Sequence, residues 1–374
     1  MTIAFTLSAY VSRQFLAAVL AMMGALSGLV SLFDLIELLR RAATRPAVAF
    51  SLVTEIAALR VPFIALRLLP FAILLGGIVA FWRLTRSSEL IVARASGVSA
   101  WAFLAGPVVC ALLLSSLAVA VVNPLAATFL ARAEHLDNTF LRASGGPLAL
   151  SGGHLWLRQV DREFAPGGVA ILYARGVRVT HRTTGHILAT GEVSVFRLDE
   201  ADHLLSRIEA TKAILQPGFW LLEDARVIHP NRAPEPAQTL RLPTDLTVSR
   251  VQDSFASPNT LSFWALPDFI DLLDRSGFSS IRHRQHFQAL LALPLLAGTM
   301  VLVAAGFSMR PTRRGGVVWM IGGGVSAGFA LFVISKLAEE FGQSGALPVP
   351  LAAWVPTAVG LLLSVALLLH VEDG

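Results

Sequence analysis

Hydrophobic residues gather near both ends of this 374-residue chain, and a more polar, strand-like stretch separates them. A helix that crosses a membrane needs about 20 predominantly apolar residues. Six stretches reach that length, three on each side of the polar stretch: 15–39, 61–82, 98–122, 287–309, 316–336 and 347–370. The pattern predicts an α-helical membrane protein with six transmembrane helices in a 3+3 arrangement. We expect the third span to stop at Asn123-Pro124, because the residue before a proline disfavours the helical conformation.

The polar stretch alternates apolar and polar residues with a period of two, which is typical of strands with one wet face. Strands are predicted at 154–160, 169–174, 177–180, 192–198 and 219–222. Glycine, proline and aspartate breaks separate them at spacings that favour an antiparallel sandwich or jelly roll. The Pro-rich run 230–243 is predicted to be an irregular loop, and 264–276 an amphipathic helix.

Three parts follow from these patterns. Residues 1–134 hold the first three transmembrane helices, 135–262 form an inserted all-β domain, and 263–374 hold a linker helix and the last three transmembrane helices. Composition agrees with a membrane protein, since 55% of the residues are hydrophobic and only 15% are charged. Soluble domains carry about 25% charged residues.

Candidate chemistry is sparse. The arginines are scattered rather than gathered into a stripe, which argues against nucleic-acid binding. The single cysteine, Cys110, excludes an intrachain disulfide framework and a cysteine-based zinc site, and the histidines show no metal-ligand spacing. The chain has no phosphate-binding loop and no nucleophile motif. We therefore expect a protein without catalytic residues, metal or cofactor.

Basic residues in the short loops predict the orientation. Three groups of basic residues fall on one side of the membrane, which we interpret as cytoplasmic: Arg13, the loop with Arg83, Arg86 and Arg94, and the loop with Arg310, Arg313 and Arg314. Both termini would then be cytoplasmic and the β insert would lie outside. One loop disagrees, because Arg40, Arg41, Arg45 and Arg60 fall on the outer side.

The segment 87–98, between the second and third spans, has the features of a short helix. Ser87 or Ser88 can cap its start, Glu89 suits its first turn and Gly97 can end it. Such a helix either connects the two spans or docks a cytoplasmic partner, with Glu89 offered to an arginine of that partner.

The stretch SELIVARASGVSAWAF, which contains Ser88, Glu89, Arg94 and Gly97, resembles the signature of the lipopolysaccharide export permeases, the LptF/LptG (YjgP/YjgQ) family. Other stretches along the whole chain are also similar to this family: LFDLIELLRRA, LRLLPFAILLGGIVAFWRL, VVNPLA, FSMRPTRRGGV and GQSGALPVPLAAWVP. The last two look more like the LptG members than the LptF members.

This resemblance implies six spans and a periplasmic β-jellyroll in the inner membrane of a Gram-negative bacterium. It implies a non-catalytic permease subunit of an ABC transporter, paired with the paralogous permease LptF. A cytoplasmic ATPase dimer, LptB, would use the ATP and Mg²⁺, and the periplasmic bridge proteins LptC and LptA would receive lipopolysaccharide. Ser88, Glu89, Arg94 and Gly97 would then belong to the helix that couples to the ATPase.

The resemblance also implies that basic residues at the end of the first span face the phosphates of the lipid. Arg40 and Arg41 occupy that place, with Arg45 a weaker candidate, although about two extra residues separate them from Asp34. Asp34 and Glu37 are possible charge partners of the two arginines. Alternatively, the arginines only extend to the outer headgroups.

Two other functions compete with export. A membrane-anchored sensor or scaffold would use the β domain to bind a ligand or partner and would need no ATPase. A lipid-modifying membrane enzyme is disfavoured because the spans contain no acid/base or metal cluster.

Overall fold

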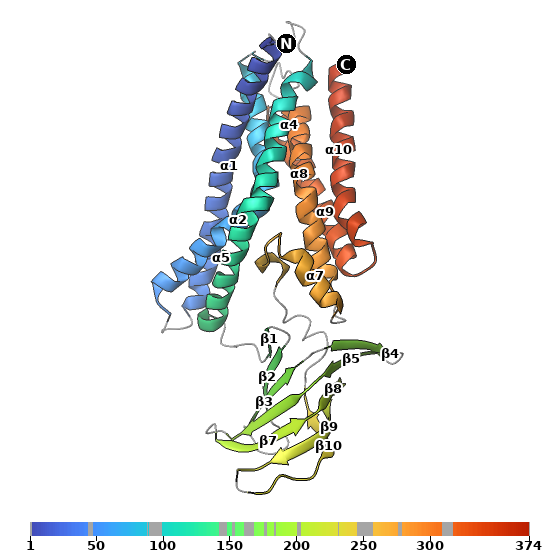
Figure 1. Ribbon diagram of the computed structural model, residues 1–374. Coiled ribbons are helices and arrows are strands. Elements are labelled where there is room, and N and C mark those ends of the chain that lie inside the picture. The colour runs from blue at the N-terminus through green and yellow to red at the C-terminus, as the bar shows by residue number, and fades with distance from the viewer. Residues whose placement is uncertain are drawn as a thin grey trace. The chain divides into compact units, whose positions relative to one another are not determined.

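The computed structural model describes residues 2–43, 48–87, 89, 99–141, 148–151, 154–160, 168–175, 178–182, 185–199, 203–230, 232–244, 257–275, 279–308 and 317–373. The chain divides into two compact units (Figure 1). The first unit is Met1–Leu141, Pro258–Pro267 and Ile281–Gly374, and the second is Arg142–Ser257 and Asp268–Ser280. Each unit is described by itself.

Long apolar helices form the first unit. They are α1 (Thr2–Ala42), α2 (Phe50–Arg86), α4 (Ala100–Leu117), η1 (Ala118–Val122), α5 (Asn123–Leu136), η2 (Asp137–Leu141), α8 (Ile281–Ser308), α9 (Val317–Gln343) and α10 (Val349–Asp373). A short 3-10 turn, η3 (Pro258–Thr260), precedes α8. Within the described residues, six segments are long and apolar enough to cross a membrane, with α4 to η2 counted as one. The predicted six spans in two groups of three are therefore confirmed.

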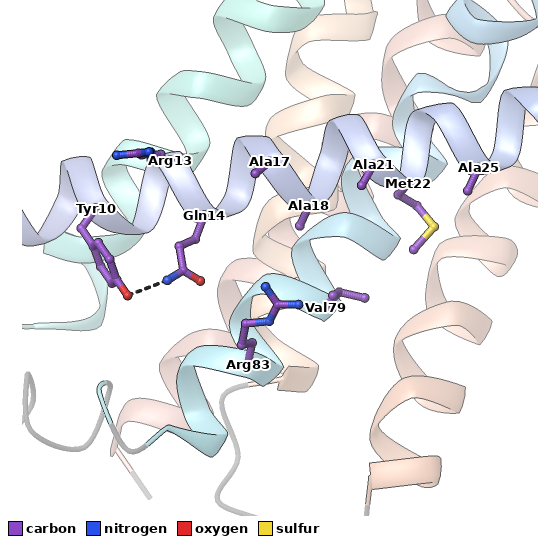
Figure 2. Close-up of a pocket in the computed structure, with 10 residues that line it drawn as sticks. All are labelled: Tyr10, Arg13, Gln14, Ala17, Ala18, Ala21, Met22, Ala25, Val79 and Arg83. Atoms are coloured by element: carbon purple, nitrogen blue, oxygen red, sulfur yellow. Dashed lines mark hydrogen bonds between the residues drawn. The ribbon is translucent and has the colours of Figure 1, made fainter.

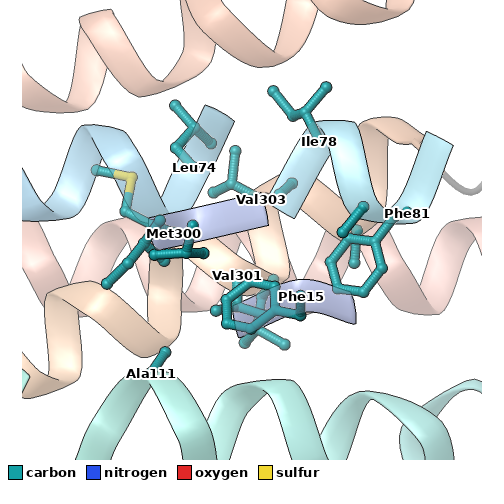
Figure 3. Packing of buried hydrophobic residues seen from close by; sticks show 14 of the residues in the cluster. Phe15, Leu74, Ile78, Phe81, Ala111, Met300, Val301 and Val303 are labelled. Atoms are coloured by element: carbon teal, nitrogen blue, oxygen red, sulfur yellow. The ribbon is translucent and has the colours of Figure 1, made fainter. Parts of the chain in front are cut away.

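The main core of this unit lies between α1, α2, α4 and α8 (Figure 3). Phe15 of α1 and Phe81 of α2 stack with their ring centroids 6.1 Å apart, and Val301 of α8 is fully buried in the same cluster. Glycine permits the closest approach, because a Cβ atom on Gly76 would lie 2.6 Å from the Cα of Val19. In α8 the buried residues extend around the helix, as expected for a helix enclosed by others.

The first three helical segments are much longer than a bilayer requires. α1 has 41 residues and α2 has 37, so they are about 55–60 Å long, against a hydrocarbon core of about 30 Å. At one end, residues 34–42, 50–60 and 126–141 pack around a separate hydrophobic cluster that includes Leu38, Ile56 and Ala133. We call these three ranges the extended end.

The third helical segment does not stop at Asn123-Pro124 as the sequence predicted. The π-helical turn η1 comes directly before these residues, and the segment continues through α5 and η2 to Leu141. Pro124 stands in the first turn of α5, where its missing N–H is tolerated. The altered turn also leaves the carbonyl of Ala120 accessible, and the indole N–H of Trp264 donates to it over 3.1 Å.

The second unit is an antiparallel β domain. Its strands are β1 (Leu148–Ser151), β2 (His154–Val160), β3 (Val169–Arg175), β4 (Arg178–Arg182), β5 (Gly185–Thr190), β6 (Val193–Leu198), β7 (Leu204–Ala210), β8 (Lys212–Gln216), β9 (Phe219–Ile228) and β10 (Gln238–Pro243). They form one curled sheet in the order β1-β2-β3-β6-β7-β9-β8-β5-β4, with β10 paired to β9 (Figure 1). The predicted all-β insert is confirmed.

One face of the curled sheet is apolar. Leu172, Val195, Ile208 and Trp220 project into its core, as the alternating burial of the strands requires. Asp224, the one described non-glycine residue with positive φ (53°), lies where β9 changes its pairing partner. The amino-terminal part of β9 pairs with β8 and its carboxyl-terminal part with β7.

The helix α7 and the strand β10 complete the domain. The helix α7 (Leu266–Arg275) lies within the range 264–276 where the sequence predicted an amphipathic helix, and Leu273 packs into the β core. The prediction of an irregular loop over 230–243 is wrong at its end, because Gln238–Pro243 pairs with β9. A strand forms here despite the prolines that precede it. Pro243 lies at the strand terminus, where its missing N–H removes little of the hydrogen bonding between strands.

Candidate functional site

Glu37, Arg40 and Arg41 form an exposed ion-pair cluster at the end of α1. The two oxygens of Glu37 accept hydrogen bonds from Nε and Nη2 of Arg40 at 2.9 and 3.0 Å, and Oε1 also accepts from Nε of Arg41 at 3.0 Å. Their spacings of three and four residues put the three side chains on one helix face. The Arg40 side chain remains 77% exposed, so its guanidinium is accessible to a ligand.

Asp34 has a different partner from the one predicted. Its Oδ1 accepts a hydrogen bond from Nη1 of Arg60 at 3.1 Å. Arg40 and Arg41 lie six and seven residues further along α1, nearly two helical turns away, which is beyond the reach of an aspartate. The predicted pairing with these arginines therefore holds for Glu37 alone.

Arg60 joins three helical segments. Its Nη2 donates to Oδ2 of Asp137 at 3.1 Å, while its Nη1 contacts Asp34. Asp137 is almost fully buried and Arg60 is 17% exposed. Asp34 Oδ2 and Arg60 Nε are buried and have no hydrogen-bond partner in the described part of the chain. A buried carboxylate–guanidinium–carboxylate cluster therefore joins the three helical segments of the extended end.

The sequence did not identify Asp137, and it counted Arg60 only as an exception to the charge rule. An acidic residue in the amphipathic continuation of the third span was the one available signal. The pairing itself joins residues 77 positions apart, and such contacts cannot be read from a single sequence.

At the opposite end of α2 lies the candidate coupling segment. Glu89 is helical and half-buried, whereas Ser88, Arg94 and Gly97 lie outside the described residues, as does Arg45 near the extended end. Ser87 ends α2, with its N–H bonded to the carbonyl of Arg83. Ser99 caps α4 by accepting a hydrogen bond from the N–H of Ala102 at 3.3 Å. The segment that contains Glu89 is therefore delimited by two capped helix ends.

A hollow of about 690 Å³ lies between the first half of α1 and the last turns of α2 (Figure 2). Alanines from α1 form its floor: Ala17, Ala18, Ala21 and Ala25. Arg13 and Arg83 flank it, and Gln14 donates a 2.6 Å hydrogen bond to the hydroxyl of Tyr10. This end of the α1–α2 pair is apolar at its centre and positively charged at its margin.

The described residues contain no group of three or more histidine, cysteine, aspartate or glutamate side chains placed to hold a metal ion. Cys110 is an unpaired thiol within α4.

Comparison with known proteins agrees with this arrangement. The family model described as "Lipopolysaccharide export system permease LptF/LptG" matches residues 9–370. The lipopolysaccharide export system permease protein LptG of Escherichia coli K12 is 24% identical over 310 residues, covering 80% of this chain and 81% of that protein. The LptG protein of Haemophilus influenzae is 22% identical over 374 residues, covering 96% of each chain. Because the family match spans nearly the whole sequence, the chain belongs to the LptF/LptG family of lipopolysaccharide export system permeases.

Proposed function

We propose that this chain is an LptG-type permease subunit that extracts lipopolysaccharide from the inner membrane and passes it to a periplasmic bridge. The family match over residues 9–370 carries the proposal. Six candidate spans and an inserted antiparallel β domain are consistent with it. The chain itself is non-catalytic in this proposal, and a separate ATPase hydrolyses ATP.

Arg40 and Arg41 are the proposed contacts for the phosphates of the lipid. A guanidinium makes paired, charge-assisted hydrogen bonds to phosphate oxygens. Both arginines are exposed at the extended end, and both already contact the carboxylate of Glu37. A phosphate offers the same type of acceptor with more negative charge, so lipid binding would exchange Glu37 for phosphate.

The proposed orientation places both termini and Glu89 in the cytoplasm and the β domain in the periplasm. The basic residues of the short loops support it. Arg60 was one of the residues that opposed this orientation. Its charge is compensated by Asp34 and Asp137, so it is not a free positive charge that weighs on topology.

The proposed partners are the paralogous permease LptF, the ATPase dimer LptB and the bridge proteins LptC and LptA. Glu89 would pair with a basic residue of the ATPase, so that ATP hydrolysis moves the segment beside α2 and narrows the cavity between the two permeases. The apolar inner face of the β domain, with Leu172 and Trp220, would shelter acyl chains from water. An edge strand of the sheet would pair with the next β domain of the bridge.

Purification from a bacterial membrane followed by reconstitution tests this function. We expect the tagged full-length chain to co-elute with a second permease and an ATPase, identified by mass spectrometry. Vesicles containing the complex should release lipopolysaccharide to a soluble bridge protein only when ATP is hydrolysed, and a catalytically dead ATPase serves as the control. A chain that elutes without any ATPase and releases no lipid would favour the sensor or scaffold function instead.

A further inference from the structure

A second pocket lies within the helical unit, enclosed by α2, α8, α9 and α10, with a volume of about 330 Å³. Its walls are mostly apolar, and a few polar side chains converge on it. Pockets that bind small ligands have this composition and volumes from about 300 Å³ upward. The pocket lies inside one subunit, and neither Arg40 nor Arg41 lines it.

Two of the side chains that line this pocket carry polar atoms without partners. Gln285 is only 2% exposed, yet its Oε1 has no hydrogen-bond partner among the described residues. The Nε2 atom of His286, the next residue in α8, is also buried without a partner. Buried polar groups are normally hydrogen-bonded, because an unsatisfied group loses its bonds to water without replacement. Two adjacent residues that line one cavity therefore carry unsatisfied groups, which indicates a ligand with a hydrogen-bonding head. Oε1 of Gln285 can only accept, whereas Nε2 of His286 can donate or accept according to its tautomer.

The charges around the pocket indicate the sign of that head. Apart from the imidazole of His286, the charged lining side chains are Arg67, Lys336 and Glu339. Lys336 is paired with Glu339 on α9, whereas Arg67 makes no hydrogen bond or ion pair with the described part of the chain. One positive charge therefore remains uncompensated at a membrane helix, where an unpaired charge is costly and typically serves a function.

The opposite part of the pocket is apolar and elongated. Along α8 its lining continues from His286 through Leu293 to Met300, a helical length of about 20 Å. Phe71 of α2 and Phe332 of α9 meet edge to face across it, with ring centroids 5.1 Å apart. Arg67 is exposed while Met300 is buried, so the charged part is accessible and the apolar part extends into the bundle.

We infer that this pocket binds one anionic amphiphile with a single acyl chain. Its singly charged phosphodiester or carboxylate head is held by Arg67 and the Nε2–H of His286, a hydroxyl group of the head, where it has one, donates to Oε1 of Gln285, and the apolar chain lies along α8. Lysophosphatidylglycerol and a free fatty acid share the single chain and the charge. The volume admits a single chain, so lipopolysaccharide, with several acyl chains, does not fit. The bound molecule would be a resident lipid that contributes to helix packing, separate from any transported lipid.

Native mass spectrometry of the delipidated full-length chain, with any partner chains that co-purify, tests the inference. The protein is titrated separately with lysophosphatidylglycerol, palmitate and zwitterionic lysophosphatidylcholine. We expect one equivalent of lysophosphatidylglycerol or palmitate to be retained, at least fivefold more than lysophosphatidylcholine. Retention of only one of the two anionic compounds would identify the head as phosphodiester or carboxylate. Equal retention of all three lipids, or of none, would overturn the proposal.

Two variants locate the binding. Arg67→Gln removes the uncompensated charge, and Ala289→Trp places a large ring at an exposed lining position of α8. Each should lower retention of the anionic lipid at least fivefold. Arg13→Gln removes an exposed arginine that lines the separate hollow beside α1, and it should retain lipid like the wild type. Unchanged retention in Arg67→Gln would overturn the assignment, as would unchanged retention in a folded Ala289→Trp variant. Transport is not measured, so a negative result leaves the proposed function untouched.

Discussion

Arg60 and Asp34 are hydrogen-bonded at 3.1 Å although 26 positions separate them in the chain. The same guanidinium contacts Asp137 at 3.1 Å. One cation thus connects α1, α2 and η2 at the extended end. These helices also share the hydrophobic cluster around Leu38 and Ile56. The extended end is therefore a small folded unit whose polar centre is Arg60.

Replacing Arg60 by alanine should destabilise this end strongly. The substitution leaves the carboxylates of Asp34 and Asp137 close together and without their shared cation. Breaking a buried ion pair by removing one partner costs about 3–5 kcal/mol. Thermal unfolding of the purified chain in detergent measures the effect. Limited proteolysis should also cleave between α1 and α2 faster in the variant.

Arg132→Ala is the matched control for this experiment. Arg132 also joins the third helical segment to α2, through a 2.9 Å contact with Glu55, but the two side chains are 67% and 45% exposed. An exposed pair contributes about 0–1 kcal/mol. Equal melting temperatures for Arg60→Ala and Arg132→Ala would show that burial gives the Arg60 cluster no special role.

Much of this fold could be predicted because hydropathy acts locally. A span is recognisable from about 20 apolar residues in one continuous stretch of sequence, and all six candidate spans were predicted in this way. Alternation with a period of two similarly identified β2, β3 and β6. The ion pairs of Glu37 with Arg40 and Arg41 were also predictable, since helix geometry fixes neighbours three and four residues apart.

Features that depend on distant residues were missed. The pairing of Arg60 with Asp137 and the approach of Gly76 to Val19 arise only when helices pack. Helix continuation through Pro124 was missed because the π-helical turn before it accommodates the proline. The strand β10 was missed because the Pro-rich composition of 230–243 favoured a loop, whereas in the structure Gln238–Pro243 pairs with β9 in an antiparallel ladder.

Gly76 sets the distance between α1 and α2, and Gly76→Ala should separate them. The new methyl group would meet the backbone of Val19 at 2.6 Å, where no side-chain rotation relieves the clash. Overpacking of this kind costs about 1–3 kcal/mol. Gly24→Ala on α1 is the control, since nothing lies within 4 Å of its new Cβ and alanine favours the helix. Thermal unfolding should therefore show a lower midpoint for Gly76→Ala alone, and identical midpoints would contradict this packing.

Glu89→Ala should weaken attachment of the proposed ATPase partner. If the carboxylate of Glu89 accepts a hydrogen bond from a basic residue across that interface, its removal costs about 1.5–3 kcal/mol, or about tenfold to 150-fold in affinity. Surface plasmon resonance with the reconstituted permeases would measure binding, and ATP hydrolysis per lipid released would measure coupling. Glu340→Ala, an exposed acid on α9, is the control and should behave like the wild type. Unchanged binding and coupling in Glu89→Ala would reduce the segment to a simple connector.

Glu37 should act as an internal competitor of lipid phosphate. It holds Arg40 through two hydrogen bonds and Arg41 through a third, so Glu37→Gln removes the negative charge that occupies both guanidinium groups. Exposed ion pairs contribute at most about 1 kcal/mol each, which corresponds to up to about fivefold tighter binding. Crosslinking to lipopolysaccharide from a photoreactive residue at Ile36 should therefore increase in Glu37→Gln and fall when Arg40 and Arg41 are both changed to glutamate. Glu55→Gln removes an exposed acid that pairs with Arg132 at the same extended end and should leave crosslinking unchanged. Equal crosslinking in Glu37→Gln and Glu55→Gln would show that Glu37 does not compete for the arginines. If the double charge reversal also left crosslinking unchanged, the two arginines would only reach the headgroup region.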